Sequence, residues 1–123
     1  MKLGRLNHVG VATPSIEKSI ALYRDMLGAT KIHAPFDLPP QGVRVCFVDT
    51  PNSQIELIEP LGESSPLHGF LAKYPAGGQL HVCFEVPDIH AAKAEMEMEL
   101  NFGMWRAVWL MISPTMRIEG SGG

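Results

Sequence analysis

Two histidines, His8 and His81, occupy corresponding places in two similar stretches of the sequence. The stretches are Leu6-Asn7-His8-Val9-Gly10-Val11-Ala12 and Gln79-Leu80-His81-Val82-Cys83-Phe84-Glu85. Each continues to a Pro, then a residue able to cap a helix, then an Ile, so both predict a strand followed by a helix. Repeated units related by an approximate two-fold axis would bring the two imidazoles together. Paired imidazoles of this kind indicate a metal site.

Glu56 is the third residue with a possible role in chemistry. Strand alternation places it on one face with Gln54 and places Ile55 and Leu57 on the other, where they are expected to pack under a helix. A carboxylate in such a strand needs a partner. Two alternatives stay open: Glu56 joins the histidines, or it faces solvent or pairs with Arg44 while each histidine is an ordinary half-buried residue. No short-range ligand motif is present, so any metal site must be assembled from separate strands.

The elements that would carry these residues follow from periodicity. A helix is expected from the Ser15 cap to Gly28, with one apolar face made of Ile16, Ile20, Tyr23, Met26 and Leu27. Extended segments are expected near residues 29–34, 42–49 and 53–59. A second helix starts after Asp88. The pattern predicts an α+β fold of two β-α-β-β-β modules: the first module at 1–61, a connection with a short helical turn at 62–78, and an incomplete second module at 79–123.

Composition excludes several classes of protein. The chain has 123 residues, with ten Lys and Arg against thirteen Asp and Glu and a formal charge of -3, which makes nucleic acid an unexpected partner. No apolar run approaches the roughly 20 residues of a membrane span. The N-terminal residues lack a secretion signal, so we expect a cytoplasmic protein, or one of the mitochondrial matrix. Cys46 and Cys83 are expected to be buried and structural. His33, His68 and His90 have no repeat partner and are expected to be ordinary exposed residues.

Several segments resemble the vicinal oxygen chelate superfamily and, within it, the methylmalonyl-CoA epimerase family. The shared segments are the His8 strand, Tyr23-Arg24-Asp25-Met26-Leu27-Gly28, Gln54-Ile55-Glu56-Leu57-Ile58-Glu59-Pro60-Leu61-Gly62, Ser65-Pro66, Gly69-Phe70-Leu71, Gly77-Gly78 and the His81 strand. The resemblance covers residues 1 to about 98. The superfamily shares the strand histidine, whereas the Glu-Pro-Leu-Gly, Ser-Pro, Gly-Phe-Leu and Gly-Gly series is typical of the epimerases.

The resemblance implies a divalent metal ion, cobalt or zinc, held by His8, Glu56 and His81. It implies an acyl-CoA thioester as the ligand and epimerisation at C2 of methylmalonyl-CoA as the reaction. Carboxylates would remove and return the C2 proton while the metal stabilises the enolate. Two alternatives remain: an impaired relative that binds only metal or ligand, and a glyoxalase-type lyase or dioxygenase on the same scaffold.

The end of the chain departs from the family pattern. The repeat places the counterpart of Glu56 at position 129, beyond Gly123, and the residues after Leu100 match neither the repeat nor the family. Glu119 is the candidate substitute for the missing carboxylate, in a catalytic role, if the second module is shorter by about ten residues. A sheet without its last strand would expose unpaired backbone groups, so a homodimer is expected.

Overall fold

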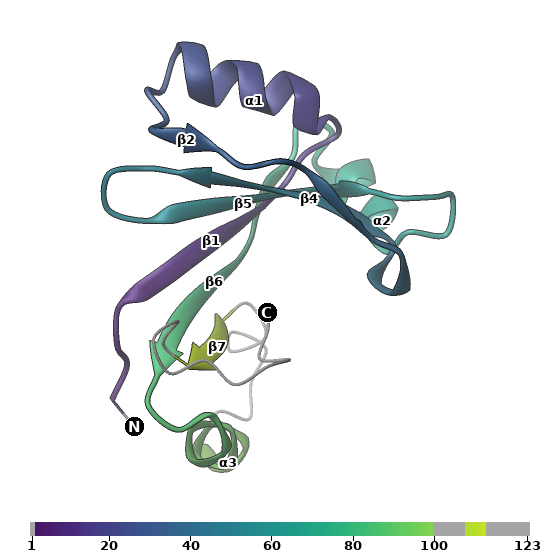
Figure 1. Ribbon diagram of the computed structural model, residues 1–123. Coiled ribbons are helices and arrows are strands. Elements are labelled where there is room, and N and C mark those ends of the chain that lie inside the picture. Colours follow the sequence, from purple (N-terminus) through teal and green to yellow (C-terminus); the bar gives the residue numbers. More distant parts are fainter. Residues whose placement is uncertain (1, 100–107, 113–123) are drawn as a thin grey trace. The chain divides into compact units, whose positions relative to one another are not determined.

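The computed structural model describes residues 2–99 and 108–112 (Figure 1). The chain divides into two compact units. We call Val9–Leu80 the central unit, and Met1–His8 together with His81–Gly123 the terminal unit. The predicted module boundaries differ from this division and remain a prediction. None of the helices in the described part of the chain has the length and apolar character needed to cross a bilayer.

The central unit is built on a sheet with the strand order β2-β4-β5-β1, and β3 also pairs with β4. β1 and β5 are parallel, whereas the other pairs are antiparallel. The bounds of the strands are β1 Leu6–Ala12, β2 Lys31–Ile32, β3 Phe36–Leu38, β4 Val43–Asp49 and β5 Gln54–Pro60. The three segments expected to be extended are therefore confirmed. β3 was not predicted, because Phe36–Leu38 is too short to show a period.

Helix α1, Ile16–Asp25, covers one face of this sheet (Figure 1). The Ser15 hydroxyl accepts the amide of Lys18 at 3.2 Å, so the predicted N-cap is confirmed. Beneath the helix lies a core that includes Ile55 and Leu57 of β5, as strand alternation predicted. Its buried members are Ile16, Cys46, Val48 and Leu57, with Val11, Ile20, Tyr23, Ala29, Ile32 and Ile55 packed around them.

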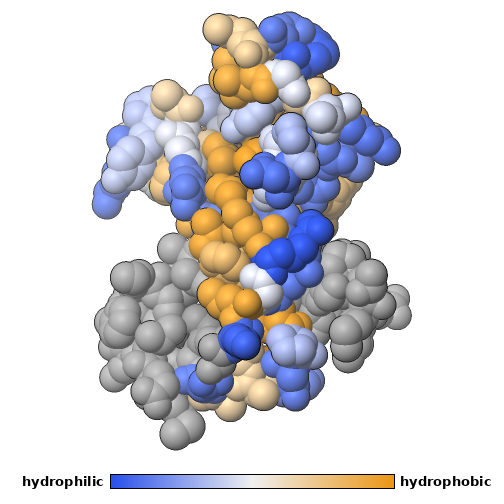
Figure 2. All heavy atoms as spheres, turned by 90° about the vertical axis from the view of Figure 1, so that its left-hand side faces the viewer, coloured by the Kyte–Doolittle hydropathy of each residue, from blue (hydrophilic) through white to orange (hydrophobic). Residues whose placement is uncertain are grey.

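The predicted apolar face of α1 is wrong at its last two positions. Met26 is 77% exposed and Leu27 60% exposed. The helix ends at Asp25 with Met26 as its C-cap, two residues before the predicted cap Gly28, so Met26 and Leu27 do not continue its buried face. Hydrophobic residues consequently gather on the surface at this end of α1, at the top of Figure 2.

The opposite face of the central sheet packs against α2, Leu67–Lys73, which confirms the short helix expected in the connection. The 3-10 turn Pro39–Gln41 leads into β4 and ends at Gly42, whose φ is 66°. The buried core on this side consists of Ala12, Val43, Val45, Ile58 and Leu67. The β4 side chains thus alternate between two cores, with Val43 and Val45 on this face and Cys46 and Val48 under α1.

Strand β6, Gly78–Val86, enters the terminal unit at His81, and its last residues run parallel to β7, Val108–Ile112. Helix α3, Ile89–Glu99, follows β6, and Asp88 Oδ1 accepts the amides of His90 and Ala91 at 3.0 and 3.1 Å. The predicted Asp88 cap is therefore confirmed. The N-terminal segment pairs with β6 through Gly4 N to Glu85 O at 2.8 Å and Glu85 N to Arg5 O at 3.0 Å. Strands and helices in this arrangement confirm the α+β class.

A candidate metal centre

His8 and His81 meet within the terminal unit. Both are buried, with 4% and 3% of their surfaces exposed, and their Nε2 atoms lie 3.2 Å apart. The ring centroids are 5.3 Å apart, and the rings are nearly perpendicular at 83°. The expectation that the repeat brings these imidazoles together is confirmed. Whether the two imidazoles could bind one metal ion depends on the distance between their Nε2 atoms.

The separation of the two nitrogens fits a single metal ion. Zinc lies about 2.0–2.1 Å from an imidazole nitrogen, so two such ligands on one tetrahedral or octahedral ion are about 2.9–3.4 Å apart. The observed 3.2 Å falls within this range. Two neutral imidazoles on one ion are also a common donor set for zinc and cobalt. The residues present therefore fit the kind of ion that the sequence led us to expect.

Glu56 lies in the middle of β5 and is 6% exposed. Its register partner in β1 is Gly10, two residues after His8. Paired residues share a sheet face, and so do residues two apart in one strand, so Glu56 belongs to the same face of the strands as His8. Gly10 has no side chain. Each of His8, Glu56 and His81 is buried and carries a donor of a kind that could hold a metal ion.

The alternative partners considered for Glu56 are wrong. Arg44 is paired in register with Glu59, whereas Glu56 is paired with Phe47, so Arg44 and Glu56 lie on opposite faces of the sheet. Arg44 makes ion pairs with Asp37 at 3.4 Å and Glu59 at 3.7 Å. Burial also excludes a solvent-facing Glu56. The Glu56 carboxylate is therefore buried on one face of the sheet, and Arg44 lies on the other face.

The second module has a different residue in the position equivalent to Glu56. Cys83, two residues after His81, is the register partner of Trp109 in β7. This pair corresponds to Gly10 and Glu56 in β1 and β5. The repeat places the counterpart of Glu56 beyond the end of the chain, and this remains a prediction; in the described residues, it is β7 that pairs with β6 after a shorter connection. Glu119 lies outside the described residues.

A polar network that sequence reasoning missed surrounds His8. His8 Nδ1 lies 2.8 Å from Asn7 Oδ1, and Asn7 Nδ2 donates to Glu85 Oε2 at 3.1 Å. Arg5 Nε lies 3.1 Å from the same oxygen. Glu85 is 6% exposed. The signal that identified Glu56, an acidic residue inside an apolar strand, applies equally to Glu85 and would have found it.

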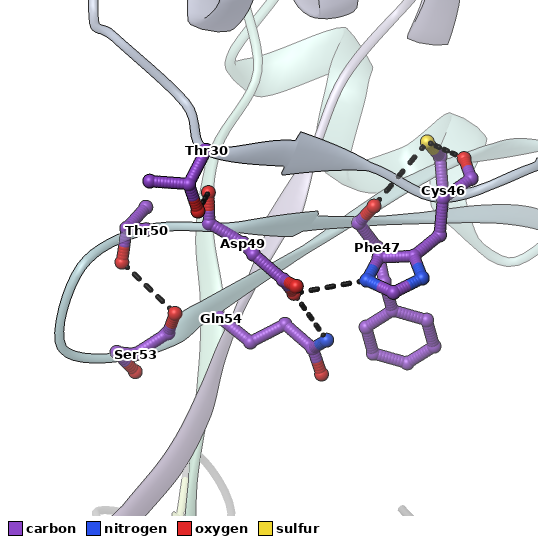
Figure 3. Close-up of polar contacts among 8 residues, drawn as sticks. Thr30, Cys46, Phe47, Asp49, Thr50, Ser53 and Gln54 are labelled. Carbon is purple, nitrogen blue, oxygen red and sulfur yellow. Dashed lines mark hydrogen bonds and ion pairs between the residues drawn. The ribbon is translucent and has the colours of Figure 1, made fainter.

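A second polar cluster, in the central unit, is structural (Figure 3). Asp49 accepts from Gln54 Nε2 at 2.8 Å and lies 3.0 Å from His33 Nε2. The hydrogen bond from Gln54, and to a smaller extent that from His33, holds the pKa of Asp49 below its usual value. Burial raises the pKa of the Cys46 thiol, which donates to the His33 carbonyl at 3.3 Å. His33 is thus partly buried and paired, so its expected ordinary exposed state is wrong.

The other two histidines without a repeat partner are exposed, as expected. His68 Nε2 donates to the carbonyl of Gly62 at 2.9 Å, and His90 lies in the first turn of α3. Cys46 and Cys83 are both buried thiols, which confirms their expected burial.

Residues 7–100 match the model of the Glyoxalase/Bleomycin resistance protein/Dioxygenase superfamily. This chain belongs to that superfamily. Its fold is therefore the vicinal oxygen chelate fold that the sequence led us to expect. Ethylmalonyl-CoA/methylmalonyl-CoA epimerase of Cereibacter sphaeroides is 53% identical over 95 residues, which cover 77% of this chain and 70% of the relative. Within the superfamily, the chain belongs to the family of these epimerases.

Two further similarities agree with this placement. Mitochondrial methylmalonyl-CoA epimerase of Mus musculus is 51% identical over 96 residues, which cover 78% of this chain and 53% of the relative. The structure of a Streptomyces coelicolor methylmalonyl-CoA epimerase in complex with 2-nitronate-propionyl-CoA has a TM-score of 0.68 at 28% identity, covering 80% of this chain and 73% of that one. The chain thus spans about half the length of the mouse relative and a larger share of the bacterial ones.

Proposed function

We propose that this chain is a metal-dependent epimerase that interconverts (2R)- and (2S)-methylmalonyl-CoA. The observation that carries the proposal is the buried His8 and His81 pair, with Nε2 atoms 3.2 Å apart, in a chain 53% identical to a named ethylmalonyl-CoA/methylmalonyl-CoA epimerase. The substrate class is supported by the related structure that holds 2-nitronate-propionyl-CoA. The chain would accordingly bind an acyl-CoA thioester.

His8, Glu56 and His81 are the proposed ligands of a divalent cation, cobalt or zinc. Their support is the donor chemistry, the burial of all three and the shared strand face of His8 and Glu56. When bound, the ion would supply Lewis-acid stabilisation of the negative charge that develops on the thioester oxygen. One carboxylate and two neutral imidazoles leave a net positive charge at a divalent ion, which favours an anionic ligand.

The protein's own groups must also move a proton at C2 of the substrate. The α-proton of a thioester is weakly acidic, so its removal needs a positioned base and a site that excludes water. Epimerisation further requires that the proton return on the opposite face. Glu119 is the carboxylate that we propose for proton transfer. Replacing it by Gln should abolish exchange at C2 while leaving metal affinity unchanged if that is its role.

Solvent exchange at C2 tests the proposed reaction directly. The metal-loaded protein is incubated with (2R)- or (2S)-methylmalonyl-CoA in D2O, and mass spectrometry follows the gain of one deuterium. We expect incorporation that requires the metal and stops when His81 is replaced by Gln. A matched control is His68→Gln, a change at an exposed histidine. Metal-loaded wild type that binds substrate but incorporates no deuterium would refute the epimerase proposal.

A second candidate is a protein that binds metal or thioester without turnover. The observation that favours it is the register of β6 and β7, which puts Trp109 where the first module has Glu56. Such a protein would bind the cation and the thioester yet give no exchange at C2. The same experiment, with binding measured in parallel, separates the two candidates.

We further propose that the chain works as a homodimer in the cytoplasm or the mitochondrial matrix. The exposed Leu22, Met26 and Leu27 at the end of α1 offer apolar surface that a second copy can cover. The word mitochondrial in the mouse relative's name supports the second location. Sedimentation at micromolar concentration tests the assembly, and a single species of 13.5 kDa would refute it.

A further inference from the structure

A chain of polar contacts leads from the surface to His8 inside the terminal unit. Arg5, with 68% of its side chain exposed, lies 3.1 Å from Glu85 Oε2, and that oxygen accepts the side-chain amide of Asn7 at 3.1 Å. The amide oxygen of Asn7 is 2.8 Å from His8 Nδ1. Asn7 and Glu85 are 78 residues apart in the sequence, so this network exists only because the N-terminal segment pairs with β6.

Glu85 determines which way the Asn7 amide points. A carboxylate oxygen only accepts hydrogen bonds, whereas a side-chain amide has a nitrogen that donates and an oxygen that accepts. The Asn7 nitrogen must therefore face Glu85, and its oxygen must face His8. The backbone bonds from Gly4 to Glu85 at 2.8 Å and from Glu85 to Arg5 at 3.0 Å hold the two strands in the required alignment.

The oriented amide in turn determines the tautomer of His8. An oxygen acceptor 2.8 Å from Nδ1 requires a proton on Nδ1, and neutral imidazole then carries a lone pair on Nε2. That lone pair is the one directed toward His81 Nε2 at 3.2 Å. We propose that Asn7, oriented by Glu85, is a positioning residue that holds His8 in the tautomer able to bind a metal through Nε2.

The expected effect on metal affinity rests on the proposed metal site, whereas the tautomer of His8 can be observed in the metal-free protein. A histidine whose second nitrogen donates to a fixed acceptor has its ring orientation and tautomer set before the metal arrives. Loss of such a partner typically weakens metal binding by about 10–100-fold. Glu85, although acidic, buried and only four residues after His81, thereby serves as an orienting group and not as a ligand.

The experiment reads the tautomer directly in the metal-free protein. Protein labelled with 15N-histidine is examined by long-range 1H–15N correlation at a pH where His8 is neutral, and His8 is assigned by the signals lost in His8→Gln. We expect wild type to show a protonated Nδ1 and an unprotonated Nε2. In Asn7→Leu, which keeps the size of the side chain but removes the amide, both tautomers should appear. Zn²⁺ affinity, measured by competition with a chelator, should fall about 10–100-fold.

Two further variants separate positioning from a general structural effect. Asn7→Asp combined with Glu85→Gln reverses the donor and the acceptor of that contact, keeps an oxygen acceptor next to Nδ1 and should retain the wild-type tautomer. Gln79→Leu makes the same amide-to-leucine change at an exposed position of β6 and should alter neither the tautomer nor Zn²⁺ affinity. A wild-type spectrum with the proton on Nε2 overturns the proposal by itself, even if Asn7→Leu fails to fold. A single unchanged tautomer in folded Asn7→Leu also overturns it.

Failure of the proposed function would look different. Wild type that binds no Zn²⁺ but shows the expected His8 tautomer, with a mixture in Asn7→Leu, refutes the metal site and leaves the positioning network established. Wild type that binds Zn²⁺ with the opposite tautomer in the metal-free state refutes the network and leaves the metal site intact.

Discussion

Two pairs of parallel strands carry the repeated histidines, and they differ in what they place opposite them. In β1 and β5, Gly10 faces Glu56 in register, and in β6 and β7 the corresponding pair is Cys83 and Trp109. The parallel pairing of the backbones is repeated, whereas the carboxylate of Glu56 has no counterpart at position 109. In the described strands, these repeated positions hold two histidines and one carboxylate.

The connections between the paired strands explain this difference. Residues 13–53 separate β1 from β5 and include α1, three short elements and β4, whereas residues 87–107 separate β6 from β7 and include α3. A parallel pair needs only one crossover helix, so the shorter connection is enough to bring β7 beside β6. The sequence of β7, Val-Trp-Leu-Met-Ile, has no His, Cys, Asp or Glu.

The largest expected effect concerns the support under β5. Leu57 is fully buried beneath α1, so Leu57→Ala should lower the free energy of unfolding by about 2–5 kcal/mol. Unfolding in denaturant measures this loss, provided that the slope of the unfolding free energy against denaturant concentration is the same in variant and wild type. Met26→Ala, at the exposed end of the same helix, is the control and should change stability by less than about 0.5 kcal/mol. Equal losses for the two variants would contradict the described packing of α1.

Replacing one of the two repeated histidines should weaken metal binding more than any other single change considered for the two strand pairs. His81→Gln removes the imidazole whose Nε2 lies 3.2 Å from His8 Nε2. Loss of a residue that only supports a ligand typically weakens metal binding by about 10–100-fold, and the loss of His81 should weaken Zn²⁺ binding by more than this. Calorimetry or chelator competition gives the affinity. His68→Gln, at an exposed histidine, should bind as wild type does. Unchanged affinity in His81→Gln would exclude this residue as a ligand.

Glu56→Gln tests whether the β5 carboxylate is the third donor. The amide keeps an oxygen but loses the charge, so Zn²⁺ affinity should fall by roughly 10-fold, less than for His81→Gln. Glu59→Gln removes a charge from the opposite face of the same strand, next to Arg44, and should leave metal affinity unchanged. Equal effects of the two changes would mean that overall charge, and not ligation by Glu56, controls binding.

Trp109→Glu would make the second strand pair resemble the first. The register pairs residue 109 with Cys83 as it pairs Glu56 with Gly10, so this change tests whether a carboxylate at residue 109 adds a fourth donor. We expect Zn²⁺ affinity to rise by up to about 10-fold. Trp109→Gln is the matched control without the charge. A glutamate variant that is folded and binds no more tightly than this control would show that the β7 position does not face the metal.

The smallest expected effect is at the start of β5, in the polar cluster of the central unit. The Gln54 hydrogen bond lowers the pKa of Asp49, so the ionised form stabilises the fold above the unfolded pKa, and this contribution is lost as the pH falls through the lowered folded value. Gln54→Leu should cost about 0.5–1 kcal/mol at pH 7 and progressively less below about pH 4. Thermal unfolding across this pH range measures the difference, and a constant difference would contradict the pKa assignment.

Local features of the chain were predictable because their causes lie within a few residues. Ser15 and Asp88 cap helices with their own side chains, and alternation along β5 places Leu57 under α1 and Glu56 on the opposite face. The end of α1 was predicted wrongly at Met26 and Leu27, because the helix ends at Asp25 and both side chains are exposed. A stripe of apolar residues shows which face of a helix packs, but not how far the sheet extends beneath it.

The sequence by itself determined the α+β class, the pairing of His8 with His81 and the selection of Glu56 as a candidate metal ligand. Repetition and alternation, on which these predictions depend, are properties of the order of residues in the chain. Only the tertiary structure decided that Arg44 lies on the other face, that Trp109 takes the place equivalent to Glu56, and that Glu85 orients Asn7 against His8. These facts depend on strand register and on contacts between residues up to 78 positions apart. Register between distant strands is set by the packing of whole faces, and no short stretch of sequence contains that information.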